Sequence, residues 1–247
     1  MRVDVSLVPG EVAVKDASNA AIVVIDVLRA SSTVSTALAN GCEEVIAAES
    51  IEEAITIAGG YARSDYVLGG ERRGLAVDGF DFGNSPMEYS EEAVAGKKVI
   101  LATTNGTRAV KQYGGAKEIL VACFLNGSAV LSALAAVSDR YIVLLCAGQD
   151  GRFSTEDTLC AGMYASELSK CAGAALSDSA RAAAALYERY HGSILDALMA
   201  SDHGAYLASI GFGDDVEYCA RQSVLNVVPR VYDRRVIRRA RLGPEES

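Results

Sequence analysis

The sequence predicts an α/β fold, a three-layer α/β/α arrangement around a mostly parallel or mixed central sheet. Strand-like and helix-like segments alternate along the chain, which is the pattern of a sheet with helices on both faces. The run AAIVVIDV at residues 20–27 is continuously apolar, as expected for a strand covered on both faces. The 247 residues, half of them hydrophobic, can bury a large core, and without a repeat or linker we expect one domain over residues 1–247.

Each element follows from local patterning. Strands are predicted at residues 2–8, 20–27, 44–48, 66–68, 97–102, 118–122 and 140–146. Helices are predicted at 31–40, 51–60, from about 105, at 127–137 and 155–171, and residues 174–222 have mostly helical patterns. Gly41 is a typical helix stop, and Ser50 with Glu53 has the spacing of a capping box. The closing segments VLNVV and RVYDRRVIRRA are predicted as strands separated by Pro229.

Composition excludes several classes of protein. The net charge of −9 disfavours nonspecific binding to nucleic acid, which depends on basic patches. The N-terminus has no apolar region of a signal peptide, and no apolar run approaches the roughly 18 residues of a membrane helix. The six cysteines form no C-x-x-C pair. We therefore expect a reduced, cytoplasmic protein without nucleic-acid or membrane partners.

The longest segment without periodicity is GGERRGLAVDGFDFGNSP, residues 69–86. Loops of this length inside a compact domain are usually functional or disordered. Because Leu75, Val77, Phe80 and Phe82 provide apolar anchors, we expect this loop to be ordered. It carries Glu71, and also Arg72 and Arg73 as candidate anion ligands.

Three predicted strand ends carry similar polar residues. They are VLRASST after residue 26, TTNGTR at 103–108 and AGQDGRFSTED at 147–157. Ligands of open α/β sheets bind at the carboxyl ends of the strands, where helix N-termini, hydroxyl groups and arginine bind anions. Helix capping alone explains such residues at any one junction. Three junctions, each with its own arginine, favour a shared anion site.

Carboxylates are the second component of these strand ends. Asp26, Glu71, Glu156 and Asp157 form an oxygen-donor set of the kind that suits Mg²⁺. A zinc site is disfavoured because the chain has only two histidines, both in the helical C-terminal region. The competing interpretation of Glu156 and Asp157 is that acidic residues favour the first turn of any helix.

Known motifs of phosphate-binding proteins and hydrolases are absent from the sequence or match it only in part. Neither G-x-x-x-x-G-K-[ST] nor G-x-S-x-G is present. Cys146 and Arg152 have the C-x5-R spacing of cysteine phosphatases, but Asp150 places a negative charge in the loop and Phe153 replaces the usual hydroxyl residue. Such a charge raises the pKa of a thiol. We interpret Cys146 as strand-end packing and keep a nucleophilic role as the alternative.

Four segments together resemble the 2-phosphosulfolactate phosphatase family. They are VVIDVLRASST, LGGERRGLAVDGFDFGNSP, LATTNGTRA and CAGQDGRFSTEDTLCAG, in this order, and the similarity runs from about residue 3 to Val231. The resemblance implies a three-layer α/β fold and a Mg²⁺-dependent phosphatase that converts 2-phospho-3-sulfolactate into 3-sulfolactate. In methanogens and some bacteria this step belongs to coenzyme M biosynthesis. The matching positions are Asp26, Arg29, Ser31, Ser32, Glu71, Arg72, Asn84, Ser85, Thr104, Asn105, Gly106, Thr107, Glu156 and Asp157.

We assign roles to these positions from their placement and chemistry. Asp26 with Glu71 or Glu156 is expected to hold Mg²⁺, and Asp157 or another of the carboxylates to protonate the departing alkoxide, so Asp26, Glu71 and Asp157 are the catalytic candidates. The substrate-binding candidates are Arg29, Ser31, Ser32, Arg72, Asn84, Ser85, Thr104, Asn105, Gly106 and Thr107. The alternatives are a phosphatase for other short phospho-hydroxy acids, a non-catalytic binder of small polyanions, and a structural or partner-binding protein. A homodimer is the base-rate expectation.

Overall fold

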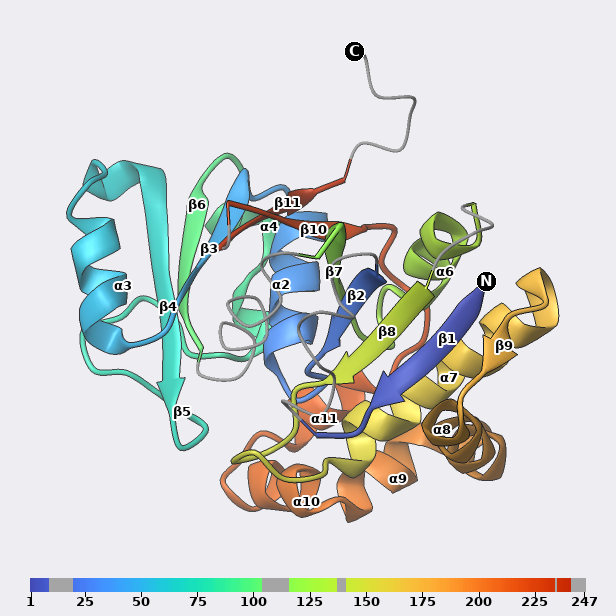
Figure 1. Ribbon diagram of the computed structural model, residues 1–247. Helices are drawn as coiled ribbons and strands as arrows, with labels where there is room; N and C mark the ends of the chain where they lie inside the picture. Colours follow the sequence, from blue (N-terminus) through green and yellow to red (C-terminus); the bar gives the residue numbers. More distant parts are fainter. Residues whose placement is uncertain (9–19, 104–115, 137–140, 234, 241–247) are drawn as a thin grey trace, which may run out of the picture.

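The computed structural model describes residues 1–8, 20–103, 116–136, 141–233 and 235–240. In this part of the chain eleven strands form one sheet in the order β5-β4-β6-β3-β11-β10-β7-β2-β8-β1-β9, with helices packed against it (Figure 1). The predicted three-layer α/β class with a mixed sheet is confirmed. The helix predicted from about residue 105 lies outside the described residues.

The elements agree closely with the sequence pattern. The strands are β1 (Arg2–Ser6), β2 (Ala20–Ile25), β3 (Glu44–Ala48), β4 (Tyr66–Arg72), β5 (Leu75–Ala76), β6 (Lys98–Ala102), β7 (Glu118–Ala122), β8 (Tyr141–Cys146), β9 (Ala175–Leu176), β10 (Pro229–Tyr232) and β11 (Val236–Arg239). The helices are α2 (Ala30–Ala39), α3 (Ile51–Ala58), α4 (Glu91–Val94), α6 (Gly127–Ala135), α7 (Thr155–Ala172), α8 (Asp178–Tyr190), α9 (Ile194–Ala200), α10 (Asp202–Ser209) and α11 (Gly213–Cys219), with short 3₁₀ turns η1 (Arg63–Asp65) and η2 (Pro86–Glu88).

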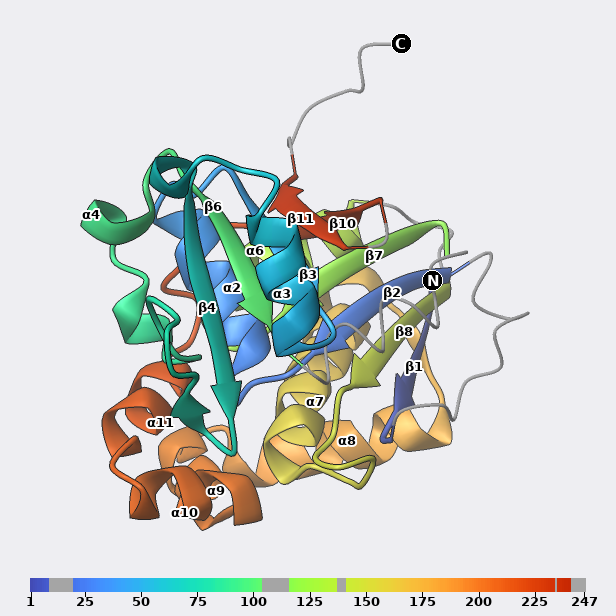
Figure 2. The ribbon, with the colours of Figure 1, turned by 90° about the vertical axis from the view of Figure 1, so that its left-hand side faces the viewer.

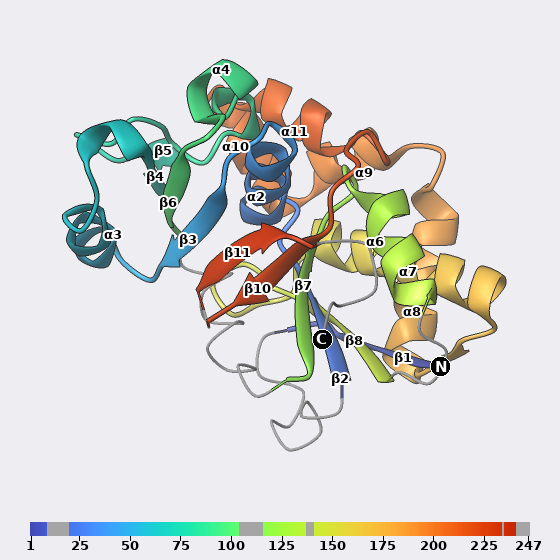
Figure 3. The ribbon, with the colours of Figure 1, turned by 90° about the horizontal axis from the view of Figure 1, so that it is seen from above.

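Two parallel groups of strands make up the sheet. One contains β4, β6 and β3, and the other contains β7, β2, β8, β1 and β9. The antiparallel hairpin β10–β11 lies between the groups and pairs with β7 on one side and β3 on the other (Figure 3). The sheet turns strongly at this hairpin, so that β4 and β8 both point toward the end of the molecule where α10 lies (Figure 1). The carboxyl ends of both groups are thereby brought together.

Alternation of side chains along the strands explains the layers. In β3 and β6, Val45 and Val99 pack in the same cluster as Leu38 of α2. Their neighbours Ile46 and Ile100 pack on the opposite face with α3. Because successive strand residues point to opposite faces, one apolar run supplies both clusters.

The C-terminal helices cover the edge of the sheet formed by the carboxyl ends of the strands. Figure 2 shows α9, α10 and α11 beside the tip of the β4–β5 hairpin. The Tyr206 hydroxyl of α10 donates a hydrogen bond to the Arg73 carbonyl oxygen at that tip, at 2.9 Å.

No helix in the described ranges has the length and apolarity that crossing a membrane would require.

One strand prediction was wrong, and one loop prediction was confirmed. Residues 224–228 form no strand, and Pro229 begins β10 instead of separating two strands. The Leu225 backbone N–H donates to the Leu125 carbonyl, which ties this segment to the loop before α6. Proline is tolerated at the first residue of a strand because its missing N–H is not needed there. The loop at 69–86 is ordered, with Gly70 N–H donating to the Phe82 carbonyl at 3.2 Å.

Gly162 is a close contact between α7 and α8, and its replacement by alanine should destabilise the fold. A Cβ at this position would lie 2.0 Å from the Ala183 carbonyl oxygen. We expect Gly162→Ala to lower the free energy of unfolding by about 1–3 kcal/mol, because the two helices must separate. Urea unfolding measures this, with Gly192→Ala as the control, since a Cβ there meets no atom within 4 Å. Equal midpoints for the two variants would contradict the packing described here.

Candidate active site

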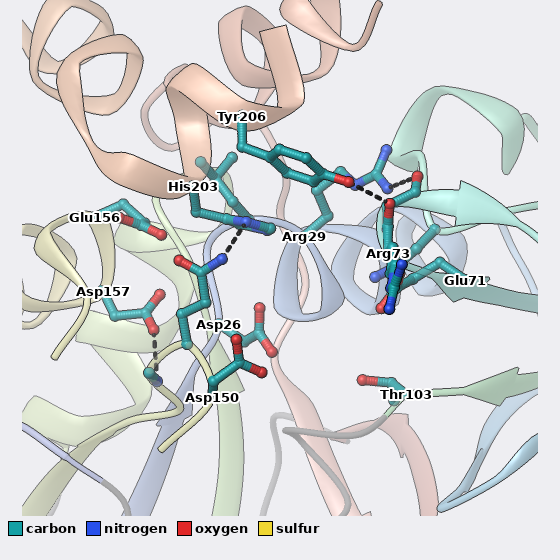
Figure 4. A pocket seen from close by; sticks show the side chains of 15 residues that line it. Asp26, Arg29, Glu71, Arg73, Thr103, Asp150, Glu156, Asp157, His203 and Tyr206 are labelled. Carbon is teal, nitrogen blue, oxygen red and sulfur yellow. Dashed lines mark hydrogen bonds between the residues drawn. The ribbon is translucent and has the colours of Figure 1, made fainter. Parts of the chain in front are cut away.

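A cavity of about 430 Å³ lies where the carboxyl ends of β2, β8, β4 and β6 meet the C-terminal helices (Figure 4). Its lining residues are Asp26, Leu28, Arg29, Glu71, Arg73, Gly74, Asn84, Thr103, Gly148, Gln149, Asp150, Glu156, Asp157, His203 and Tyr206. Five of these carry carboxylates. The cavity is therefore an acidic site at the edge of the sheet where ligands of α/β proteins usually bind.

One wall of the cavity consists of buried carboxylates. Asp26 directly follows β2 and is 6% exposed, and Glu156 in the first turn of α7 is 4% exposed. The Ala30 N–H donates to Asp26 Oδ1 at 3.3 Å, and no described residue donates a hydrogen bond to the Glu156 carboxylate. Buried charges are normally paired or bound to metal. This wall is thus short of positive partners.

Asp157 joins the ends of two central strands. Its Oδ1 accepts the Val27 N–H at 2.8 Å, and its Oδ2 accepts the Gly148 N–H at 3.0 Å. The Ser154 hydroxyl accepts the Asp157 N–H at 3.2 Å and so caps α7. Both carboxylate oxygens therefore contact backbone, an arrangement that fixes the segments after β2 and β8 relative to each other.

Burial and crowding raise the pKa of these acids. Burial, opposed by the Ala30 N–H and reinforced by the charges of Glu156 and Glu71, raises the pKa of Asp26 to about 7. Burial and the neighbouring Asp26 and Glu156 carboxylates raise the pKa of Asp157 well above its usual value. The ligand-free cavity consequently holds protons near neutral pH.

Arg29 is largely occupied by protein groups. Its Nη1 donates to Asp215 Oδ2 at 2.7 Å, and its Nη2 donates to the Gly74 carbonyl at 2.7 Å. The guanidinium lies over the Phe212 ring, with Cζ 4.4 Å from the centroid. Asp215 also accepts the Ser85 hydroxyl at 2.6 Å. Arg29 thus lines the cavity mainly as a connection between α2, the β4–β5 hairpin and α11.

The opposite wall is the tip of the β4–β5 hairpin. Glu71 Oε2 accepts the Gly74 N–H at 2.5 Å, and Tyr206 holds the Arg73 carbonyl. Both arginines at the tip are exposed; Arg73 lines the cavity, and Arg72 does not. Arg72 ends β4, whereas Arg73 lies beyond the strand with φ +54, and this turn separates the two neighbours.

The cavity brings together part of the predicted site. Asp26, Arg29, Glu71, Asn84, Glu156 and Asp157 line it. Ser31, Ser32, Ser85 and Arg72 do not: the Ser31 hydroxyl accepts the Asp26 N–H at 3.0 Å, and the Ser32 hydroxyl donates to the Val27 carbonyl at 2.8 Å. These serines support the strand end from behind. Thr104, Asn105, Gly106 and Thr107 lie outside the described residues, and Thr103, directly before them, lines the cavity.

Several lining residues were not predicted. His203 and Tyr206 come from α10, and Gln149 with Asp150 comes from the loop after β8. The Gln149 side chain contacts His203 Nδ1 at 3.1 Å, and a hydrogen bond between His203 and the Leu28 backbone ties α10 to the loop after β2. Burial lowers the pKa of His203. His203 lies more than forty residues beyond the last of the three polar strand ends, where no strand-end pattern applies. The one signal in the sequence was that the chain has only two histidines.

Cys146 belongs to the hydrophobic core. It is fully buried, packs in the cluster that contains Leu159 and Val130, and does not line the cavity. Its interpretation as strand-end packing is confirmed. Arg152, the other end of the C-x5-R spacing, exchanges backbone hydrogen bonds with Gln149 in a tight turn.

The donor set of the cavity fits Mg²⁺ shared with a ligand. Among the described residues no three His, Cys, Asp or Glu side chains form a ready-made metal group. Mg²⁺ needs only one or two carboxylates, with water and substrate oxygens completing its shell. The buried Asn84 Oδ1 has no hydrogen-bond partner among the described residues and is a further oxygen donor at the cavity. Asp26, Glu71, Glu156 and Asn84 are therefore the side chains that could hold this ion.

Fold and cavity together define an α/β protein with an acidic small-ligand site at the ends of its strands. Residues 6–234 match the family model of 2-phosphosulpholactate phosphatase, and the chain belongs to this family of phosphoric monoester hydrolases. The resemblance noted from the sequence is confirmed.

Similar proteins cover almost the whole chain. A relative from Clostridium beijerinckii is 34% identical over 96% of this chain and 99% of its own length. One from Caldanaerobacter subterraneus is 37% identical over 88% of this chain and 90% of its own, and one from Clostridium perfringens is 42% identical over 83% of each. All three are named probable 2-phosphosulfolactate phosphatase.

The raised pKa of Asp26 predicts a pH-dependent stability. Between the ordinary value of 3.8 and about 7 the folded metal-free protein holds a proton at Asp26 that the unfolded chain has released. Stability therefore decreases as the pH rises through this window, by at most about 1.4 kcal/mol per pH unit for one group. Asp26→Asn removes this titration, so its free energy of unfolding in EDTA should exceed that of the wild type increasingly up to about pH 7. A difference that does not change with pH would contradict the assignment.

Proposed function

We propose that this protein is a Mg²⁺-dependent phosphatase that hydrolyses 2-phospho-3-sulfolactate to 3-sulfolactate and phosphate. The names of its relatives support this substrate. With this substrate, the reaction would be a step of the kind found in coenzyme M biosynthesis. The observation that carries the proposal is the wall of buried carboxylates, Asp26 and Glu156, facing the cavity with few positive partners. A protein that only binds anions gains nothing from carboxylates that face its ligand.

The charge of the substrate supports a requirement for a divalent cation. Phosphosulfolactate carries a phosphate, a sulfonate and a carboxylate, and five carboxylates line the cavity. Without a cation, these groups would repel one another strongly in a partly desolvated site. Mg²⁺ held by Asp26 with Glu71 or Glu156 would bring the phosphate to the acidic wall, neutralise its charge and lower the pKa of a bound water.

Proton transfers are assigned to the carboxylate cluster. Water attacks phosphorus, the bond between phosphorus and the C2 oxygen breaks, and the departing alkoxide needs a proton. A cluster whose acids have raised pKa values can accept the proton of the water and return one to the alkoxide at neutral pH. Asp157 is retained here as a member of this cluster, while its two backbone contacts give it a positioning role as well.

Phosphate release from 2-phospho-3-sulfolactate tests this function. We expect release that requires Mg²⁺, stops in EDTA, and falls at least about 100-fold in kcat for Asp26→Asn, the size of losing one strong electrostatic contribution. Cys146→Ala should retain turnover, because its thiol lies in the core. Release that ignores EDTA but is lost in Cys146→Ala would overturn the proposal in favour of the C-x5-R alternative. Release from other phospho-hydroxy acids alone would keep the chemistry and change the substrate, and binding without any release would leave a polyanion-binding protein.

A further inference from the structure

Arg73 has an unusual backbone conformation at the rim of the cavity. It lies at the tip of the β4–β5 hairpin with φ +54, in the left-handed region that residues other than glycine rarely adopt. Such a conformation costs free energy and persists only where the surroundings impose it. Here the Tyr206 hydroxyl holds the Arg73 carbonyl at 2.9 Å, and Gly74 is held on both sides by Glu71 and Arg29. The fold therefore fixes an arginine at a position where glycine would be the less strained choice.

The guanidinium of Arg73 forms no hydrogen bond or ion pair with another described residue. It lines the cavity, yet no carboxylate of the described residues lies within ion-pair distance of it. Arg29, the other lining arginine, already pairs with Asp215 and stacks on Phe212. Arg72 lies outside the cavity, where its charge acts on Glu52 of α3. In the described part of the site, Arg73 is thus the arginine available to an anion.

A chain of buried contacts places this arginine. Ser85 donates to Asp215, Asp215 pairs with Arg29, and Arg29 donates to the Gly74 carbonyl next to Arg73. Side chains in such a connected network have one arrangement each, so the hairpin tip is preorganised before a ligand arrives. Fixing the backbone of Arg73 in this way reduces the part of the entropy loss that comes from ordering the tip when an anion binds.

Arg73 lies across the cavity from the carboxylate wall. Figure 4 shows Glu156, Asp157 and Asp26 on one side and Arg73 with Glu71 on the other. If Asp26 and Glu156 hold Mg²⁺, one of the two pairs in the proposed function, the phosphate lies at the carboxylate wall and the opposite wall receives a group that does not react. In 2-phospho-3-sulfolactate the carboxylate is attached to the carbon that bears the ester oxygen, whereas the sulfonate is one bond further away. The sulfonate is therefore the anion that extends to the far wall.

We propose that Arg73 determines substrate specificity by binding the sulfonate of 2-phospho-3-sulfolactate. The inference rests on the proposed function and goes beyond it by assigning one substrate group to one residue. The planar guanidinium can donate two parallel hydrogen bonds to sulfonate oxygens. Arg29 and Asp215 act through Arg73, as positioning residues.

The test compares two substrates that differ in one group. 2-Phospholactate keeps the phosphate and the carboxylate and lacks the sulfonate. For 2-phospho-3-sulfolactate we expect Arg73→Ala to raise KM by about 10- to 100-fold, the effect of losing a charge-assisted contact, with little change in kcat. For 2-phospholactate the same variant should behave like the wild type. Arg189→Ala, an exposed arginine of α8, is the control for loss of one positive charge and should leave both substrates unaffected.

A second variant separates binding from folding. Arg73→Gly removes the guanidinium and also relieves the left-handed backbone, so its melting temperature should be at least that of Arg73→Ala while its KM defect is the same. Arg72→Ala should raise KM less than Arg73→Ala does. A melting temperature of Arg73→Gly well below that of Arg73→Ala would contradict the strain described here.

Several results would overturn the proposal. An equal loss on both substrates would assign Arg73 to the carboxylate or phosphate, and no loss on either would remove it from binding. An effect of Arg72→Ala as large as that of Arg73→Ala would show that specificity is not determined by Arg73. If the wild type turns over neither substrate, the proposed function fails separately, and calorimetry with 3-sulfolactate and lactate still decides the inference. Tighter binding of 3-sulfolactate that Arg73→Ala abolishes supports it, and equal binding in both proteins overturns it.

Discussion

The buried ion pair between Arg29 and Asp215 connects the three parts of the molecule that form the cavity. Arg29 precedes α2 at the end of β2, Asp215 lies in α11, and the same guanidinium holds the Gly74 carbonyl of the β4–β5 hairpin. Both side chains of the pair are 5% exposed or less. Removing one partner of a buried pair leaves an uncompensated charge, which typically costs 3–5 kcal/mol. The sheet, the hairpin and the C-terminal helices therefore keep one relative arrangement, and the cavity keeps its shape.

Against this well-paired contact, the carboxylate wall is unfavourable in the ligand-free protein. Asp26, Glu156 and Asp157 are buried close together; burial and the Glu156 charge raise the pKa of Asp26, and burial with the charges of Asp26 and Glu156 raises the pKa of Asp157. A fold selected only for stability would replace such acids or pair each with a cation. Binding of a divalent cation and an anionic ligand would convert the repulsion into attraction. The instability of this wall is thus a physical argument for ligand binding that depends on the local charges and burial, independently of family membership.

The sequence predicted the sheet and the acidic residues well, because both follow from local patterns. The run at 20–25 is β2, and Asp26 follows it at the edge where ligands bind. The sequence could not predict the direction in which individual side chains point. Ser31 and Ser32 follow Asp26 closely but face the backbone, since the helix begins at Ala30 and turns them inward. Arg72 was preferred to Arg73, yet the left-handed tip of the hairpin, which no local pattern indicates, points Arg73 into the cavity. His203 lines the cavity because α10 packs against segments that are distant in the sequence.

The division of labour in the cavity follows from this geometry. Groups assigned to chemistry lie at the ends of β2 and β8 and at the start of α7, which are held by the central sheet and by the two backbone contacts of Asp157. The group assigned to recognition lies on the hairpin tip, which contacts α10 through Tyr206. Because the tip is attached through a few polar contacts, its sequence can change without disturbing the carboxylate wall. Related proteins with the same wall and a different residue at the tip would then be expected to hydrolyse phosphate esters that carry a different second group.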